Sequence, residues 1–172
     1  DLKCIFQYDS EGIRKLVAKG GVDSFDDLVA YVSIYRPSAL DVGADEKYVN
    51  RKKGKENYEV PEILQDALGK TYGLFIYQEQ VMQVLNIVGK IPLRDCYQVI
   101  KAISKKNLSA FQKFKDKFVE NGQETLGHSK EQMEEYWNTI EAWAGYGFNK
   151  TLTEDTIIYL SLIHISEPTR RY

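Results

Sequence analysis

Apolar residues recur every three to four positions along most of this sequence, and this spacing constrains the fold more than any other feature. Such a period places apolar side chains on one face of an α-helix. Sustained alternation of apolar and polar residues, which marks a half-buried strand, is absent. The sequence therefore predicts an all-α fold, an irregular assembly of several helices without a large sheet.

Local signals mark the first two helices. Ser10 is suited to cap a helix that a Gly-Gly pair ends at residues 20 and 21. Ser24 begins the second helix, in which Asp27 stands three residues on and completes a capping box, and Pro37 stops it. The remaining helices are predicted from the apolar period alone, as a short helix after Pro61 and helices within 71–88 and over 93–104, 109–119 and 129–143.

Two segments interrupt the helical pattern. Residues 41–59 are polar and lysine-rich and contain Gly43 and Gly54, which predicts a long basic loop. Residues 144–150 predict a glycine-rich turn.

Composition sets bounds on the class of protein. The 172 residues fit one domain, or one domain and a tail, and the net charge of -2 means that any affinity for nucleic acid depends on how charge is distributed. Cys4 and Cys96 have neither a CxxC spacing nor a nearby histidine pair, which predicts reduced thiols in a cytoplasmic protein rather than a zinc site. No stretch is apolar enough to cross a membrane. The first residue is not Met and no leader follows it, which predicts a piece of a longer protein.

Four features carry side chains suited to phosphates or bases, although each alone is also typical of an ordinary helix surface. Lysines neutralise phosphates, and an arginine before a proline can present its planar guanidinium to a phosphate. Gln and Tyr side chains can hydrogen-bond to bases or stack on them, and glycines allow the backbone to approach a ligand closely. The features are the basic residues within 51–55 and 101–117, the Tyr35-Arg36-Pro37 triplet, the segment from Tyr77 to Met82, and the segment from Ala144 to Lys150. The acidic residues are scattered, and His128 and His164 lack partners for nucleophile activation, so no catalytic or metal-binding residues are predicted in this chain.

These features occur in the same order as in the bacterial DNA polymerase III alpha subunit, the C-family replicative polymerase, which the chain resembles. The matching segments are Ile5 to Arg14 (IFQYDSEGIR), Ser24 to Ala30 (SFDDLVA), Tyr35-Arg36-Pro37, Asn50 to Gly54 (NRKKG), Thr71 to Met82 (TYGLFIYQEQVM), Ala102 to Lys106 (AISKK) and Ala144 to Lys150 (AGYGFNK). On this resemblance, residues 1–150 are identified as a fingers-region fragment of a bacterial or phage-encoded member.

The resemblance implies that this fragment binds the incoming dNTP and the template-primer DNA during DNA replication. The catalytic aspartates of the family lie in the palm, outside this chain, so the parent is a DNA-directed DNA polymerase, a nucleotidyltransferase that uses Mg²⁺, whereas the fragment alone is predicted to be inactive. The implied partners are the rest of the polymerase chain and, through it, the sliding clamp and replisome subunits, with no membrane.

The resemblance also implies two sets of binding residues. The nucleotide-binding set is Arg36, Tyr77, Gln78, Gln80, Lys101, Lys105, Lys106, Phe148, Asn149 and Lys150. The DNA-binding set is Arg51, Lys52, Lys53 and Lys113. Ile100 and Lys101 stand where the family has two adjacent arginines, and Ser38 stands where it has glycine, which predicts a weaker or differently shared grip on phosphate.

Beyond Lys150 the sequence departs from the family. Residues 151–160 resemble either a divergent polymerase continuation or the opening block of an intein, and both interpretations stay open. Residues 161–172 resemble a translated sequencing adaptor and are predicted to be non-native. The alternative for the whole chain is a non-enzymatic helical module that binds DNA or a protein.

Overall fold

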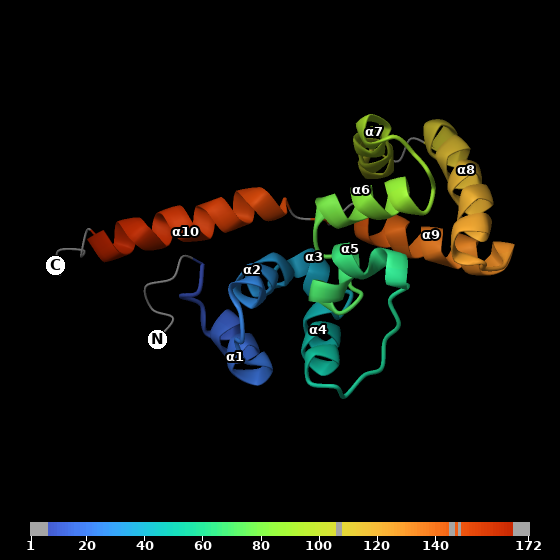
Figure 1. The fold of residues 1–172 in the computed structure, drawn as a ribbon. Helices are drawn as coiled ribbons and strands as arrows, with labels where there is room; N and C mark the ends of the chain where they lie inside the picture. The colour runs from blue at the N-terminus through green and yellow to red at the C-terminus, as the bar shows by residue number, and fades with distance from the viewer. Residues whose placement is uncertain (1–6, 106–107, 145–146, 148, 167–172) are drawn as a thin grey trace. The chain divides into compact units, whose positions relative to one another are not determined.

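The computed structural model describes residues 7–105, 108–144, 147 and 149–166, and the described elements are all helical (Figure 1), which confirms the all-α prediction. The chain divides into two compact units, described separately below. The first comprises residues 1–57 and 148–172, and the second comprises residues 58–147.

The first unit is built from five α-helices in the described residues. They are α1 (Glu11–Gly20), α2 (Phe25–Ile34), α3 (Pro37–Leu40), α4 (Ala44–Lys52) and α10 (Lys150–Ser166). The predicted caps are present: the Ser10 hydroxyl accepts from the backbone N–H of Ile13, and Ser24 forms a capping box with Asp27. Gly21, just past α1, has a φ of 77°, a conformation in which glycine avoids the steric cost of a side chain.

The prediction of one long loop over residues 41–59 is wrong in its first half, where the structure has helix α4. Ala44, Tyr48 and Val49 are buried along one side of α4, which packs against α1 and α2. Acidic side chains lie in its first turn and basic side chains in its last turn, as the helix dipole favours. Only these three residues of α4 are buried, and they stand in a lysine-rich stretch, so the spacing of apolar residues did not predict this helix.

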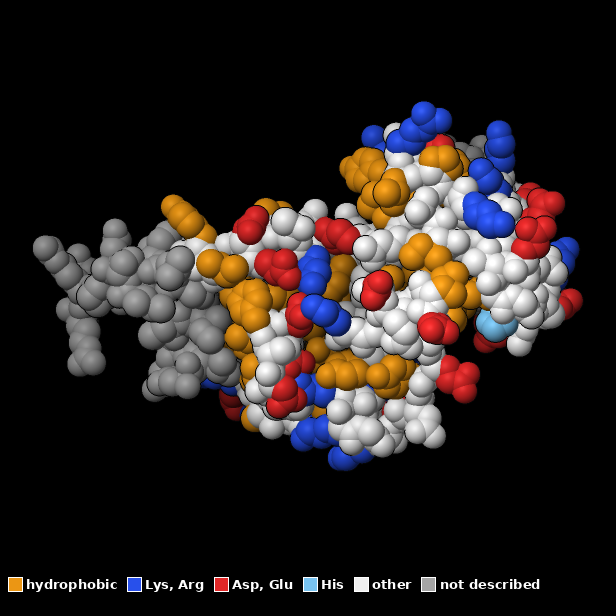
Figure 2. All heavy atoms as spheres, in the orientation of Figure 1, with side chains coloured by type: hydrophobic (Ala, Val, Ile, Leu, Met, Phe, Trp, Pro, Cys, Tyr) orange, Lys and Arg blue, Asp and Glu red, His pale blue; other side chains and the backbone are white. Residues whose placement is uncertain are grey.

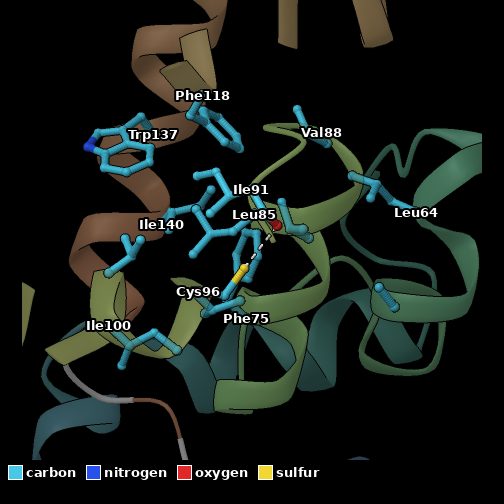
Figure 3. Close-up of a cluster of buried hydrophobic side chains, with 14 of the residues drawn as sticks. Leu64, Phe75, Leu85, Val88, Ile91, Cys96, Ile100, Phe118, Trp137 and Ile140 are labelled. Carbon is cyan, nitrogen blue, oxygen red and sulfur yellow. Dashed lines mark hydrogen bonds between the residues drawn. The ribbon is translucent and has the colours of Figure 1, made fainter. Parts of the chain in front are cut away.

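The second unit contains the remaining elements. They are η1 (Glu62–Leu64), α5 (Gln65–Leu68), η2 (Gly69–Thr71), α6 (Gln78–Ile87), α7 (Leu93–Ser104), α8 (Leu108–Leu126) and α9 (Lys130–Ala144). Helices α6, α7, α8 and α9 pack against one another around one hydrophobic core (Figure 3). Phe118 and Trp137 are fully buried in it with ring centroids 5.3 Å apart, and Cys96 lies among these residues as a buried free thiol.

Helix α8 extends beyond the predicted 109–119 and continues through Gly122 to Leu126. A Cβ atom at Gly122 would lie 2.2 Å from the Met133 Cε, so the glycine lets α9 approach α8 closely. This tertiary contact offsets the low helix propensity of glycine.

Candidate functional site

Two of the family-like segments, Ile5 to Arg14 and Tyr35-Arg36-Pro37, meet in the first unit. Tyr35 packs on Gly12, where a Cβ atom would lie 1.7 Å from the Tyr35 hydroxyl oxygen. Any larger residue at position 12 would displace the Tyr35 ring. Glycine at this position therefore joins the start of α1 to the Tyr35-Arg36-Pro37 triplet.

A pocket of about 480 Å³ lies beside this contact. Arg36 is the N-cap residue of the four-residue helix α3, without a side-chain cap hydrogen bond, and Pro37 occupies the first position of that helix. The Arg36 side chain is half-buried, and burial lowers the pKa of its guanidinium, which is nonetheless protonated in proteins. The pocket is lined by Gln7, Asp9, Ser10, Ile13, Val32, Tyr35 and Arg36. It offers a planar cation with polar neighbours, a combination that suits a phosphate or carboxylate, although the Asp9 carboxylate on its wall opposes an anion.

Two of the cations predicted to bind DNA are engaged inside the first unit. The Lys52 side chain is 4% exposed, and its Nζ lies 2.9 Å from an Asp23 carboxylate oxygen and 2.5 Å from one of Asp27. The Arg51 Nε lies 2.8 Å from a Glu56 carboxylate oxygen. These contacts give Lys52 a structural role, so we remove it from the DNA-binding set. Lys53, the next residue, is exposed.

Asp27 is the centre of this buried network. Burial by itself raises the pKa of the Asp27 carboxyl, but hydrogen bonds from Lys52, from the Asp23 backbone N–H and from the Tyr48 hydroxyl outweigh it, so the pKa is lowered. Burial likewise opposes the charge of Lys52, and its hydrogen bonds to Asp27 and Asp23 raise its pKa. Both groups are therefore ionised in the folded protein.

Lys150 and Asn149 also make contacts within the first unit. The Lys150 Nζ lies 3.1 Å from an Asp26 carboxylate oxygen and 3.3 Å from one of Glu154, which fastens α10 to α2. Burial lowers the pKa of Lys150, but the hydrogen bonds and negative charges of Asp26 and Glu154 together outweigh it, so the pKa is raised. The Asn149 side chain accepts from the backbone N–H of Leu152 at 2.8 Å and caps α10. Phe148, predicted beside them, is outside the described residues.

In the second unit, Gln80 is a structural residue rather than a nucleotide contact. Its Oε1 accepts from the backbone N–H groups of Ile76 and Tyr77, and its Nε2 donates to the Ala67 carbonyl and the Thr71 hydroxyl. Gln80 is 5% exposed, and these four hydrogen bonds use both donors of its Nε2 and both acceptor sites of its Oε1. Gln80 therefore joins the start of α6 to the preceding turn and is removed from the nucleotide-binding set.

Two further family-like segments, Thr71 to Met82 and Ala144 to Lys150, meet at the start of α6. A Cβ atom at Gly147 would lie 2.9 Å from the Gln78 Cγ and 3.0 Å from the Gln78 backbone nitrogen. The glycine therefore permits a close approach to the backbone of α6, whereas its predicted approach to a ligand stays a prediction. Gln78 is half-buried, whereas Tyr77 is only 3% exposed and presents little surface to a ligand.

The lysines that remain available lie on α7 and α8. Lys101 and Lys105 are exposed along α7, and Lys113 is exposed on α8, which packs against α7. Figure 2 shows basic side chains gathered over these two helices. Ile100 is 3% exposed and belongs to the core (Figure 3), so of the two positions where the family has arginines, only 101 faces solvent. Lys106 is outside the described residues.

The predicted nucleotide-binding residues lie in both compact units, so a single site formed by all of them stays a prediction. Arg36 belongs to the first unit, whereas Tyr77 and Lys101 belong to the second.

In the part of the chain that the structure describes, no group of three or more His, Cys, Asp or Glu side chains is placed to hold a metal ion. Within the same part of the chain, no helix is long and apolar enough to span a bilayer.

Sequence reasoning missed two exposed residues beside the lysines. Arg94 and Tyr97 lie on the same face of α7 as Lys101, with exposed fractions of 86% for the Arg94 side chain and 54% for Tyr97. The signal was available, because residues three or four apart on a helix are neighbours.

Comparisons with known proteins match most of this chain to one family. The model of the bacterial DNA polymerase III alpha subunit finger domain matches residues 1–125. The chain is 40% identical over 148 residues to the DNA polymerase III subunit alpha of Aquifex aeolicus, and 36% and 33% identical to those of Campylobacter jejuni and Escherichia coli K12. Each comparison covers 86% of this chain but only 12–13% of the relative. This chain thus belongs to the bacterial DNA polymerase III alpha subunit finger-domain family.

Proposed function

We propose that this chain is the part of a replicative DNA polymerase that binds the incoming dNTP and the template-primer DNA. The observation that carries the proposal is the family match over residues 1–125, which includes the Arg36 pocket segments and the lysines of α7. The proposed parent is a DNA-directed DNA polymerase, and its Mg²⁺ would be held by carboxylates outside this chain.

The contacts within each unit leave fewer residues available to bind the dNTP and the DNA than the sequence alone predicts. Lys101 on α7 and Lys105 just after it are both exposed and would neutralise the triphosphate. In the first unit, Arg36 offers a planar cation to a phosphate or carboxylate at its own pocket. Cations placed around a transferring phosphoryl group stabilise the charge that develops on it. Lys53 and Lys113, both exposed, are the proposed contacts to the DNA backbone.

The proposed surroundings follow from the same family. The rest of the polymerase chain would be the direct partner, with the sliding clamp and replisome subunits reached through it, in the cytoplasm. The competing function is a non-enzymatic helical module that binds DNA or a protein, and nucleotide dependence distinguishes the two.

A titration tests the proposal directly. The 172-residue chain would be titrated against a fluorescent primed template, with and without the matching dNTP, at two salt concentrations. We expect the dNTP to tighten binding, binding to weaken steeply with salt, and no nucleotide to be incorporated. Binding that is indifferent to dNTP would favour the non-enzymatic module.

A further inference from the structure

The N-terminal half of α7 carries an exposed apolar and basic surface that the proposed nucleotide contacts do not use. We call it the α7 platform and define it as Leu93, Arg94 and Tyr97. Leu93 and Tyr97 are each 54% exposed and stand four residues apart, and the Arg94 side chain is 86% exposed. Figure 2 shows hydrophobic side chains beside basic ones over α7.

Helix geometry places Tyr97 beside both other members of the platform. At 3.6 residues per turn, Leu93 and Tyr97 lie about 40° apart around the axis, Arg94 and Tyr97 about 60° apart, and Tyr97 and Lys101 about 40° apart. Another side of α7 is fixed in the core by Cys96, Val99 and Ile100 (Figure 3). The platform is therefore held on a packed helix that keeps Arg94 directed outward.

We propose that the α7 platform binds single-stranded DNA, with Tyr97 stacking on a base and Arg94 contacting the neighbouring phosphate. An aromatic ring beside a cation is the combination with which proteins hold single strands without reading sequence. A single exposed aromatic residue is ordinary, but here an aliphatic neighbour extends the apolar surface and a guanidinium lies at its edge.

The charges on α7 favour an anionic partner, and the exposed Tyr97 ring beside them favours a nucleic acid, which presents both phosphates and stackable base faces. Asp95 is the one acidic residue of α7, and its carboxylate already lies 3.7 Å from the Arg94 Nε. The exposed side continues from Tyr97 to Lys101 and Lys105, so a strand stacked on Tyr97 would extend along a row of positive charge. In the polymerase this strand would be unpaired template, an identity that rests on the proposed function.

The test uses a fluorescent oligodeoxythymidine of about 16 nucleotides, a length suited to single-strand binding sites, with no dNTP present. Its anisotropy would be measured with the 172-residue chain and its Tyr97→Ala, Tyr97→Phe and Arg94→Ala variants. Tyr159→Ala is the matched control, because Tyr159 is 66% exposed on α10. Circular dichroism would verify that every variant keeps its helices.

We expect Tyr97→Ala to weaken binding roughly tenfold, and Tyr97→Phe to stay within about twofold of the unaltered chain, because phenylalanine retains the stacking ring. Arg94→Ala should lower the slope of log affinity against log salt by about 0.7, the value for one phosphate contact on a single strand. A strand with abasic sites should bind the unaltered chain and Tyr97→Ala equally.

Unchanged affinity in Tyr97→Ala, or an equal loss in Tyr97→Phe and Tyr97→Ala, would overturn the proposal and leave this face for a protein contact. Because the assay contains no dNTP and changes no residue of the proposed triphosphate set, its failure is distinct from a failure of the proposed function.

Discussion

Single tyrosine hydroxyls hold much of the first unit together. The Tyr8 hydroxyl donates to the Leu28 carbonyl, that of Tyr31 to the Gly21 carbonyl, and that of Tyr48 to an Asp27 carboxylate oxygen. All three rings are buried, so each tyrosine contributes an apolar body to the core and a polar end to a specific partner. The many tyrosines in the sequence are therefore explained in this unit by packing rather than by base stacking.

The buried carboxylate of Asp27 gives a prediction at this scale. Asp27→Asn would leave Lys52 with only Asp23 as a charged partner, and we expect a loss of about 3 kcal/mol in the free energy of unfolding. Urea denaturation would measure it, with Asp66→Asn, a change of an exposed carboxylate, as the control.

The same residue predicts a pH dependence. The folded-state pKa of Asp27 is lowered, so its stabilising contribution is complete above the unfolded value of about 3.9 and is lost as pH falls through the lower folded value. The acid loss of stability below about pH 4 should be smaller in Asp27→Asn than in the unaltered chain. An equal acid loss in both would show that Asp27 does not contribute.

Among the elements, those with local signals were predictable and those fixed by tertiary contacts were not. Ser10 and Ser24 cap their helices as predicted, because a capping hydroxyl acts within three residues. Helix α4 was missed because only Ala44, Tyr48 and Val49 face the core. The end of α8 was missed because Gly122 is compatible with a helix only through its fit to Met133.

The candidate site divides in the same way. The family-like segments could be picked out from the sequence, and the structure joins two pairs of them, through Gly12 and Tyr35 and through Gly147 and Gln78. It did not predict that Gln80 would be used internally, because a buried hydrogen-bond network has no local pattern.

The joint between the turn before α6 and α6 itself can be tested at Gln80. Gln80→Leu would remove four hydrogen bonds and leave the buried backbone groups of Ile76, Tyr77 and Ala67 without this partner. We expect a destabilisation of about 3 kcal/mol and faster amide hydrogen exchange at Ile76 and Tyr77. Gln83→Leu, on the exposed side of α6, is the matched control. Equal stability of the two variants would contradict the structural role of Gln80.

At the scale of the whole molecule, the proposed binding residues lie in both compact units, Arg36 in the first and Lys101 in the second. The chain spans only 12–13% of the length of the relatives compared here. The account at this scale depends on the exposed lysines of α7 acting on the nucleotide rather than on the DNA alone.

Lys101→Ala in the complete polymerase is the most direct test of that claim. We expect kcat/KM for the dNTP to fall at least tenfold, because a charge-assisted contact of about 1.5–3 kcal/mol is lost, while the Kd for primed template stays within about twofold. Lys117→Ala, an exposed lysine on α8 outside the proposed set, should leave both quantities unchanged. An equal loss of nucleotide use and of DNA binding in Lys101→Ala would contradict the account, because it would assign the lysine to the DNA backbone.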